Sequence, residues 1–212
     1  MLIPVLFAAA LAAADVDWGA LEPLYRDLHE HPELSFQETA TAAKLAGRLR
    51  ALGFDVTEGV GKTGVVGVLE NGTGPTVMLR TELDALPVEE KTGLAFASKA
   101  TGKNPAGETM PVMHACGHDV HMTAWVGAAT TLANERKSWR GTLVMIAQPA
   151  EEVGGGTRAM LDDGLFTRFP KPDFVLAIHD SDALPAGTIG IKGGPLLASA
   201  DSDYITGQSY HV

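Results

Sequence analysis

Cysteine is nearly absent from this 212-residue chain, which contains only Cys116. A single cysteine cannot form an internal disulfide, so the fold depends on packing, and Cys116 is either a small buried hydrophobic residue or a reactive or metal-binding group. Runs of lysine and arginine are also lacking, and 16 basic against 26 acidic side chains give a formal charge of −10. We therefore expect no nucleic-acid partner, because the chain offers no basic surface to the phosphate backbone.

Apolar runs long enough to cross a membrane are lacking too, since a bilayer requires roughly 20 apolar residues. The longest run, residues 1–14, reads MLIPVLFAAALAAA and is followed by Asp15. An apolar run that ends in small residues predicts a secretory signal peptide, so we expect an exported protein, periplasmic or extracellular, with no stable membrane span after processing. A frayed start or a buried N-terminal helix is the alternative interpretation of this run.

The remaining pattern predicts helices and strands in alternation. A first amphipathic helix ends before Pro32, a second begins at a capping box formed by Ser35 and Glu38, and a longer third helix is capped by Asp119. Residues 95–111 lack periodicity and predict a loop. Four short apolar runs predict strands: residues 65–69, 76–79, 143–147 and 174–178. This order indicates an α/β fold with a mixed, mostly parallel sheet flanked by helices.

Four polar clusters follow apolar stretches of the chain, which is where open α/β sheets gather ligands from different strands. The first cluster contains Glu82 and Asp84. Two carboxylates at i and i+2 lie on the same side of an extended chain, so their repulsion must be offset by a cation, a metal ion or a raised pKa. A solvated turn is the alternative interpretation of this cluster.

The second cluster, residues 114–121, reads HACGHDVH and combines three histidines with the only cysteine. Thiolate and imidazole are ligands that zinc, manganese, cobalt and nickel sites use, and Gly117 allows the chain to bend so that Cys116 and His118 reach one centre. Asp119 either orients a ligating imidazole or caps the following helix. A thiol hydrolase based on Cys116 is a further alternative, but it leaves the carboxylate clusters without a role.

The third and fourth clusters add carboxylates and another imidazole. Glu151 and Glu152 follow an apolar strand, and adjacent side chains of an extended chain point in different directions, so one carboxylate can bind metal while the other handles a proton. A charged pair at the mouth of a loop is the alternative. His179 ends a very apolar strand, which is the position of a ligand but also that of a buried core histidine.

In this order, the clusters resemble the amidohydrolase branch of the dinuclear metallo-carboxypeptidase and aminoacylase superfamily, which includes hippurate hydrolases and auxin-conjugate hydrolases. The match takes in residues 28–36, LHEHPELSF, residues 193–201, GGPLLASAD, and nearly everything from Tyr25 onward. The resemblance implies Glu151 as the general base and Asp84 as a carboxylate that orients a metal-bound histidine. It also implies four metal ligands, which are Cys116, His118, Glu152 and His179.

The resemblance implies two divalent ions, Mn, Zn, Co or Ni, and hydrolysis of the amide bond of N-acyl amino acids or small peptides by a metal-bridging water. It assigns residues 15–200 to the N-terminal part of the catalytic domain and residues 201–212 to the beginning of a lid and dimerisation domain. His211 matches a substrate-binding histidine that acts in a partner subunit, so a full-length form is compatible with a homodimer. Because family members are longer, we expect impaired activity, and a degenerate relative that binds metal or a partner is the alternative.

Overall fold

The computed structural model describes residues 16–181, 183–185 and 187–190. The expected signal peptide, the expected start of the lid and His211 lie outside the described residues. The described part contains no helix that is both long and apolar enough to cross a membrane. The helices are α1 (Trp18–Glu30), α2 (Thr39–Ala51), α3 (His118–Asn134), α4 (Gly156–Asp162) and α5 (Leu165–Arg168). The strands are β1 (Asp55–Val60), β2 (Gly64–Asn71), β3 (Thr76–Glu82), β4 (Thr101–Lys103), β5 (Thr109–Pro111), β6 (Gly141–Gln148) and β7 (Phe174–Ala177).

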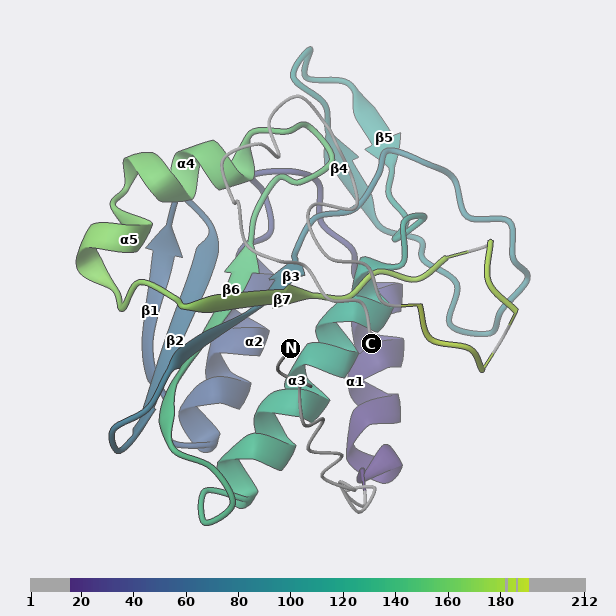
Figure 1. Ribbon diagram of the computed structural model, residues 1–212. Coiled ribbons are helices and arrows are strands. Elements are labelled where there is room, and N and C mark those ends of the chain that lie inside the picture. Colours follow the sequence, from purple (N-terminus) through teal and green to yellow (C-terminus); the bar gives the residue numbers. More distant parts are fainter. Residues whose placement is uncertain (1–15, 182, 186, 191–212) are drawn as a thin grey trace, which may run out of the picture.

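Five strands form the main sheet in the order β1-β2-β6-β3-β7 (Figure 1). β3 pairs in parallel with β6 and with β7, whereas β2 pairs antiparallel with β1 and with β6. The mixed sheet flanked by helices that the sequence predicts is therefore confirmed. Because β3, β6 and β7 run in the same direction, their carboxyl ends meet at one edge of the sheet, and the polar residues that follow them are brought together.

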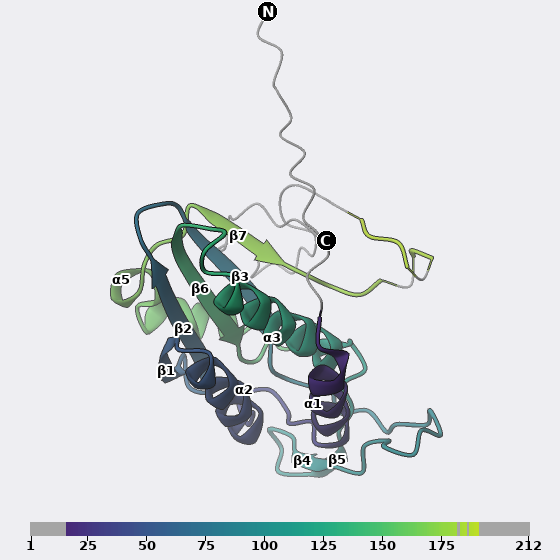
Figure 2. The ribbon, with the colours of Figure 1, turned by 90° about the horizontal axis from the view of Figure 1, so that it is seen from below.

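Helices cover both faces of the sheet: α1, α2 and α3 lie on one face, and α4 and α5 lie on the other (Figure 2). β6 shows why its sequence is apolar throughout. Met145 and Ala147 belong to the core beneath α1 to α3, whereas Val144 and Ile146 belong to the core beneath α4 and α5. Successive side chains of a strand point to opposite faces, so a strand covered on both faces needs apolar residues at every position.

Two strand regions differ from the sequence expectation. The predicted loop 95–111 contains the β4–β5 hairpin, in which the Asn104 side-chain oxygen accepts hydrogen bonds from the backbone N–H groups of Ala106 and Glu108. Strands of three residues are too short to show a periodicity. β1 was not expected, because this edge strand is largely exposed and carries polar residues such as Asp55.

The predicted helix caps are also wrong in detail. The N-cap residue of α2 is Glu38 rather than Ser35, whose hydroxyl instead donates to the Asp84 carboxylate at 2.6 Å. The N-cap residue of α3 is Gly117 rather than Asp119, which lies in the first turn. Gly117 has a φ of 72°, and a Cβ at this position would lie 2.6 to 2.7 Å from the Asp180 carboxylate, so both conformation and space require glycine.

Candidate metal centre

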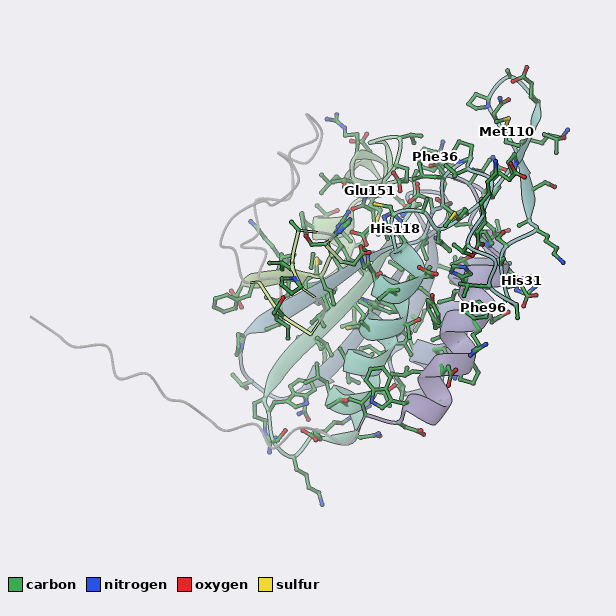
Figure 3. All side chains as sticks on the ribbon, turned by 90° about the vertical axis from the view of Figure 1, so that its right-hand side faces the viewer. His31, Phe36, Phe96, Met110, His118 and Glu151 are labelled. Atoms are coloured by element: carbon green, nitrogen blue, oxygen red, sulfur yellow. The ribbon has the colours of Figure 1, made fainter. Side chains whose placement is uncertain are left out.

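Side chains from four segments meet where β3, β6 and β7 end and α3 begins. Figure 3 shows His118 and Glu151 together at this end of the sheet, and the His118 Nε2 and Glu151 Oε2 atoms are 3.8 Å apart. The parallel register places Glu82, at the end of β3, opposite Gln148, at the end of β6. The turn that follows β6 carries Glu151 and Glu152, and the segment that follows β7 carries His179. The sheet topology thus unites clusters that are far apart in the sequence.

His118 is the central donor of the site. It is 1% exposed, and its Nδ1 lies 2.7 Å from the Asp84 carbonyl oxygen. A carbonyl can only accept, so Nδ1 donates this hydrogen bond, and Nε2 faces the carboxylates of Glu151 and Glu152, each at 3.8 Å. Neither the buried His118 Nε2 nor the buried Glu152 Oε1 has a hydrogen-bond partner. Buried ligand atoms that face one another without a hydrogen-bond partner are atoms that a bound cation would satisfy.

A thiol and a second imidazole complete this side of the site. Cys116 Sγ lies 3.5 Å from His179 Nε2, and His179 Nδ1 lies 2.6 Å from the Asp180 carbonyl oxygen, to which it donates as His118 Nδ1 donates to a carbonyl. Burial and the nearby carboxylate of Glu152 raise the pKa of the Cys116 thiol to about 12. The thiolate therefore needs a cation beside it, because a metal ion deprotonates a coordinating thiol.

The described residues contain four groups of donor atoms: two involve His121, with Glu82 and His118 or with His179 and Asp180, and the other two consist of the predicted ligands and base and share His118. In one of these last two groups, donor atoms of Cys116, His118 and His179 all lie within 4.8 Å of one another, and in the other those of His118, Glu151 and Glu152 do so. The structure therefore brings together all four predicted ligands and the predicted base. Two donor groups with a common member suit two neighbouring cations.

The sequence predicted that the adjacent Glu151 and Glu152 side chains point in different directions, but in the structure they converge. Both carboxylates approach His118 because residues 151–154 form a turn instead of an extended strand. Burial, together with the carboxylates of Glu151 and Asp84, raises the pKa of Glu152. A cation bound between these carboxylates would offset the repulsion between them.

Asp84 contacts the site through its carboxylate, which binds the backbone of the glutamate turn, and through its own carbonyl, which binds His118. Its carboxylate accepts hydrogen bonds from the N–H groups of Glu151 at 2.9 Å and Glu152 at 3.0 Å, in addition to the Ser35 hydroxyl. The hydrogen bond to His118 comes from the Asp84 carbonyl, while the Asp84 Oδ1 atom lies 3.8 Å from the same ring nitrogen. Asp84 thus orients the imidazole and the glutamate turn at once.

The structure adds a network that sequence reasoning did not assemble, in which the buried His121 joins the buried Glu82 to the exposed Asp180. His121 Nδ1 lies 3.2 Å from Glu82 Oε2, and His121 Nε2 lies 3.0 Å from Asp180 Oδ1. Burial alone lowers the pKa of His121, but the Glu82 and Asp180 carboxylates outweigh burial and raise it. Burial alone raises the pKa of Glu82, but the Arg80 guanidinium and His121 hold it well below its ordinary value. Arg80 is therefore a cation that offsets the charge of Glu82, the first of the two closely spaced carboxylates.

His114, the remaining histidine of this cluster, is excluded from the donor groups of the described residues. Its side chain is buried, and neither ring nitrogen has a hydrogen-bond partner. Burial and the neighbouring His118 lower the pKa of His114 to about 3, so the ring is neutral.

The only signal in the sequence for the network of Glu82, His121 and Asp180 was the position of these residues inside the polar clusters.

Comparison with known proteins agrees with this geometry. The chain is 41% identical over 178 residues to N-acetylcysteine deacetylase of Bacillus subtilis, covering 83% of this chain and 44% of that protein. It is 42% identical over 188 residues to hippurate hydrolase of Campylobacter jejuni, covering 87% of this chain and 45% of that protein. The chain thus spans less than half the length of these relatives.

Solved structures give the same result. A dinuclear metal binding peptidase from Bacillus subtilis superposes with a TM-score of 0.73 at 39% identity, covering 84% of this chain and 47% of that chain. The aminobenzoyl-glutamate utilization protein from Klebsiella pneumoniae has a TM-score of 0.63 at 25% identity, covering 83% of this chain and 47% of that chain. Residues 78–210 match the peptidase family M20/M25/M40, and the resemblance drawn from the sequence is confirmed. This chain belongs to peptidase family M20/M25/M40.

Proposed function

We propose that this chain carries the metal centre of an amidohydrolase that cleaves N-acyl amino acids or small peptides. The observation that carries the proposal is the pair of buried, unpartnered atoms, His118 Nε2 and Glu152 Oε1, 3.8 Å apart. Relatives named for deacetylation of N-acetylcysteine and for hydrolysis of hippurate support the substrate class. Four residues would hold the metal: Cys116, His118, Glu152 and His179.

Two divalent ions at this site would lower the pKa of water and polarise an amide carbonyl. The Glu151 side chain is 26% exposed and that of Glu152 is 15% exposed, which suits Glu151 to exchange protons with a substrate and Glu152 to hold an ion. A carboxylate oxygen of Glu151 takes a proton from the attacking water and returns it to the amide nitrogen as the C–N bond breaks. The products are a carboxylic acid and a free amine. The Asp84 contacts keep both glutamates in place during these steps.

The same substitution at the two neighbouring glutamates tests these roles. Metal content per chain is measured by elemental mass spectrometry, and hydrolysis of hippurate and N-acetylcysteine is measured on the same samples. We expect bound metal and weak but measurable turnover for the unaltered chain, the same metal content without turnover for Glu151→Gln, and loss of metal for Glu152→Gln. Unchanged turnover in Glu151→Gln refutes its role as the base. Metal retention without turnover in the unaltered chain favours a non-catalytic, metal-binding relative.

We further propose that the protein is exported and that His211 contacts substrate in a partner subunit of a homodimeric full-length form. The apolar run of residues 1–14 supports export. N-terminal sequencing of protein from the periplasm or the culture fluid is expected to begin at Asp15, and a chain that retains Met1 contradicts the proposal. His211→Ala is expected to lower turnover while metal content remains the same.

A further inference from the structure

Two buried carboxylates hold the backbone of the turn that carries Glu151 and Glu152. The N–H of Ala150 donates to Glu38 Oε1 at 2.8 Å, and the next two N–H groups, of Glu151 and Glu152, donate to the Asp84 carboxylate. Three consecutive amides of this turn are thus bound to side chains from distant parts of the chain. A hydrogen bond to a charged acceptor is shorter and stronger than one between neutral groups.

Glu38 is the N-cap residue of α2, but its side chain makes no capping hydrogen bond to that helix, although it is fully buried at 0% exposure. Besides Ala150, its carboxylate accepts the N–H of Phe36 at 2.9 Å and the Thr63 hydroxyl at 2.5 Å. A carboxyl group is rarely buried unless its partners offset the loss of hydration. Glu38 is therefore a built acceptor for particular donors rather than an incidental core residue.

The backbone at both amide donors is in a conformation that must be stabilised. Phe36 has a φ of 61° and Ala150 has a φ of 47°, and residues with a Cβ rarely adopt this left-handed region. One oxygen of Glu38 binds the N–H groups of both residues. Ser35, next to Phe36, contacts Asp84, so the two carboxylates are linked through a single short segment.

The turn is also closed by hydrogen bonds among its own residues, so its orientation relative to His118 depends on its contacts with Glu38 and Asp84. The N–H groups of Gly155 and Gly156 both donate to the Ala150 carbonyl, at 3.2 and 3.1 Å. A Cβ on Gly156 would lie 1.5 Å from the Pro149 carbonyl oxygen, so only glycine allows this closure. A turn that is closed internally moves as a unit, and a shift at Ala150 is transmitted to both glutamates that follow it.

We propose that Glu38 is a positioning residue that, together with Asp84, sets the backbone of the Ala150–Glu152 turn and thereby aims both glutamates at His118. The expected effect on metal binding rests on the proposed function, whereas the contact between Glu38 and the turn does not. Glu38 lies 112 residues before Ala150 in the sequence, so the turn is positioned by a remote part of the chain.

Four variants of the full chain separate positioning from simple stabilisation. Glu38→Ala removes the acceptor. Glu38→Asp keeps the charge but withdraws it by one methylene. Glu38→Gln keeps one oxygen for the N–H groups of Phe36 and Ala150, while its amide N–H can donate to the Thr63 hydroxyl. Thr63→Val is the matched control, because it removes a partner of Glu38 that does not belong to the turn.

Two readouts are made on each folded variant, well below its melting temperature. The first is amide hydrogen exchange at Ala150, Glu151 and Glu152 in the metal-free chain, resolved by NMR. The second is affinity for Co²⁺, followed by its absorption spectrum. We expect Glu38→Ala to accelerate exchange at Ala150 by about tenfold, which corresponds to one lost hydrogen bond, and to weaken Co²⁺ binding by about tenfold or more. Glu38→Asp is expected to change both in the same direction, Glu38→Gln to change both less than Glu38→Asp because it keeps the acceptor oxygen in place and loses only its charge, and Thr63→Val to stay near the unaltered chain.

The outcomes are distinct. If Glu38→Ala lowers the melting temperature but leaves exchange at the turn and Co²⁺ affinity unchanged, Glu38 is only structural and the proposal is wrong. If Glu38→Ala does not fold, Glu38→Asp decides by the same two readouts. If Glu38→Gln changes exchange at the turn and Co²⁺ affinity as much as Glu38→Asp does, the proposal is also wrong. If the unaltered chain binds no Co²⁺, the proposed function fails, while the exchange data still decide the contact between Glu38 and the turn.

Discussion

Replacing His29 with leucine is expected to lower the free energy of unfolding by about 3 kcal/mol in mildly acidic solution. His29 Nδ1 lies 2.6 Å from Asp119 Oδ2, and Nε2 lies 3.0 Å from Glu90 Oε1. The three side chains are 7%, 3% and 0% exposed. Removing the imidazole leaves two buried carboxylates without their cation, and breaking a buried ion pair typically costs about 3 to 5 kcal/mol. That is a large share of the roughly 5 to 15 kcal/mol that stabilises a domain.

The pH dependence of this loss of stability follows from the shifted pKa values of His29 and Glu90. Burial alone lowers the pKa of His29, but its hydrogen bonds to Glu90 and Asp119 hold it above its ordinary value of 6.5. Such a group contributes stability that is present below pH 6.5 and lost as the pH rises through its pKa in the folded chain. Burial alone raises the pKa of Glu90, but bonds from Thr92 and His29 hold it below 4.5, so its contribution is lost as the pH falls. The effect of the substitution is therefore largest between pH 4.5 and 6.5.

The assay is urea unfolding at a pH inside this window and at an alkaline pH. His31→Leu is the matched control, since His31 ends the same helix but is 63% exposed and lies 3.0 Å from Asp27. We expect a loss below about 1 kcal/mol for this exposed pair. Equal losses for the two variants, or a loss for His29→Leu that does not change with pH, would refute the reasoning.

Three further predictions concern the site. Cys116→Ala is expected to weaken metal binding more than about tenfold in a chelator competition, because a ligand is lost. Gly117→Ala is expected to cost about 1 to 2 kcal/mol in urea unfolding, since φ is 72° and the added Cβ meets the Asp180 carboxylate. Arg80→Met leaves Glu82 buried without its cation, and we expect a loss of about 3 kcal/mol at neutral pH that shrinks as the pH falls below 4.5 and Glu82 binds a proton.

Much of the fold could be predicted from the sequence, because its signals are local. The run from Leu143 to Ala147 predicts a buried strand, and β6 spans Gly141–Gln148. The caps were missed because Ser35 donates to the distant Asp84 carboxylate instead of capping α2, and because α3 begins at His118, so that Asp119 lies in the first turn, where its carboxylate contacts the Val120 N–H and the distant His29. A cap predicted from spacing alone assumes that no distant partner competes for the side chain.

The candidate site divides in the same way. Cys116 and His118 lie within one motif, so their types and spacing already indicated a metal ligand pair. The convergence of Glu151 and Glu152 could not be predicted, because it depends on a turn whose amides are bound by Asp84 and by Glu38.

The sequence by itself determined which chemistry is present: thiol, imidazole and carboxylate groups at strand ends, and the family to which they belong. Tertiary structure alone decided that Arg80 offsets the charge of Glu82, that Glu82 meets His121, and that Glu38 holds the Ala150 turn. The physical reason is that ligand type and strand or helix preference are properties of short segments. Distances between remote groups depend instead on strand order, parallel register and the burial of both faces of the sheet.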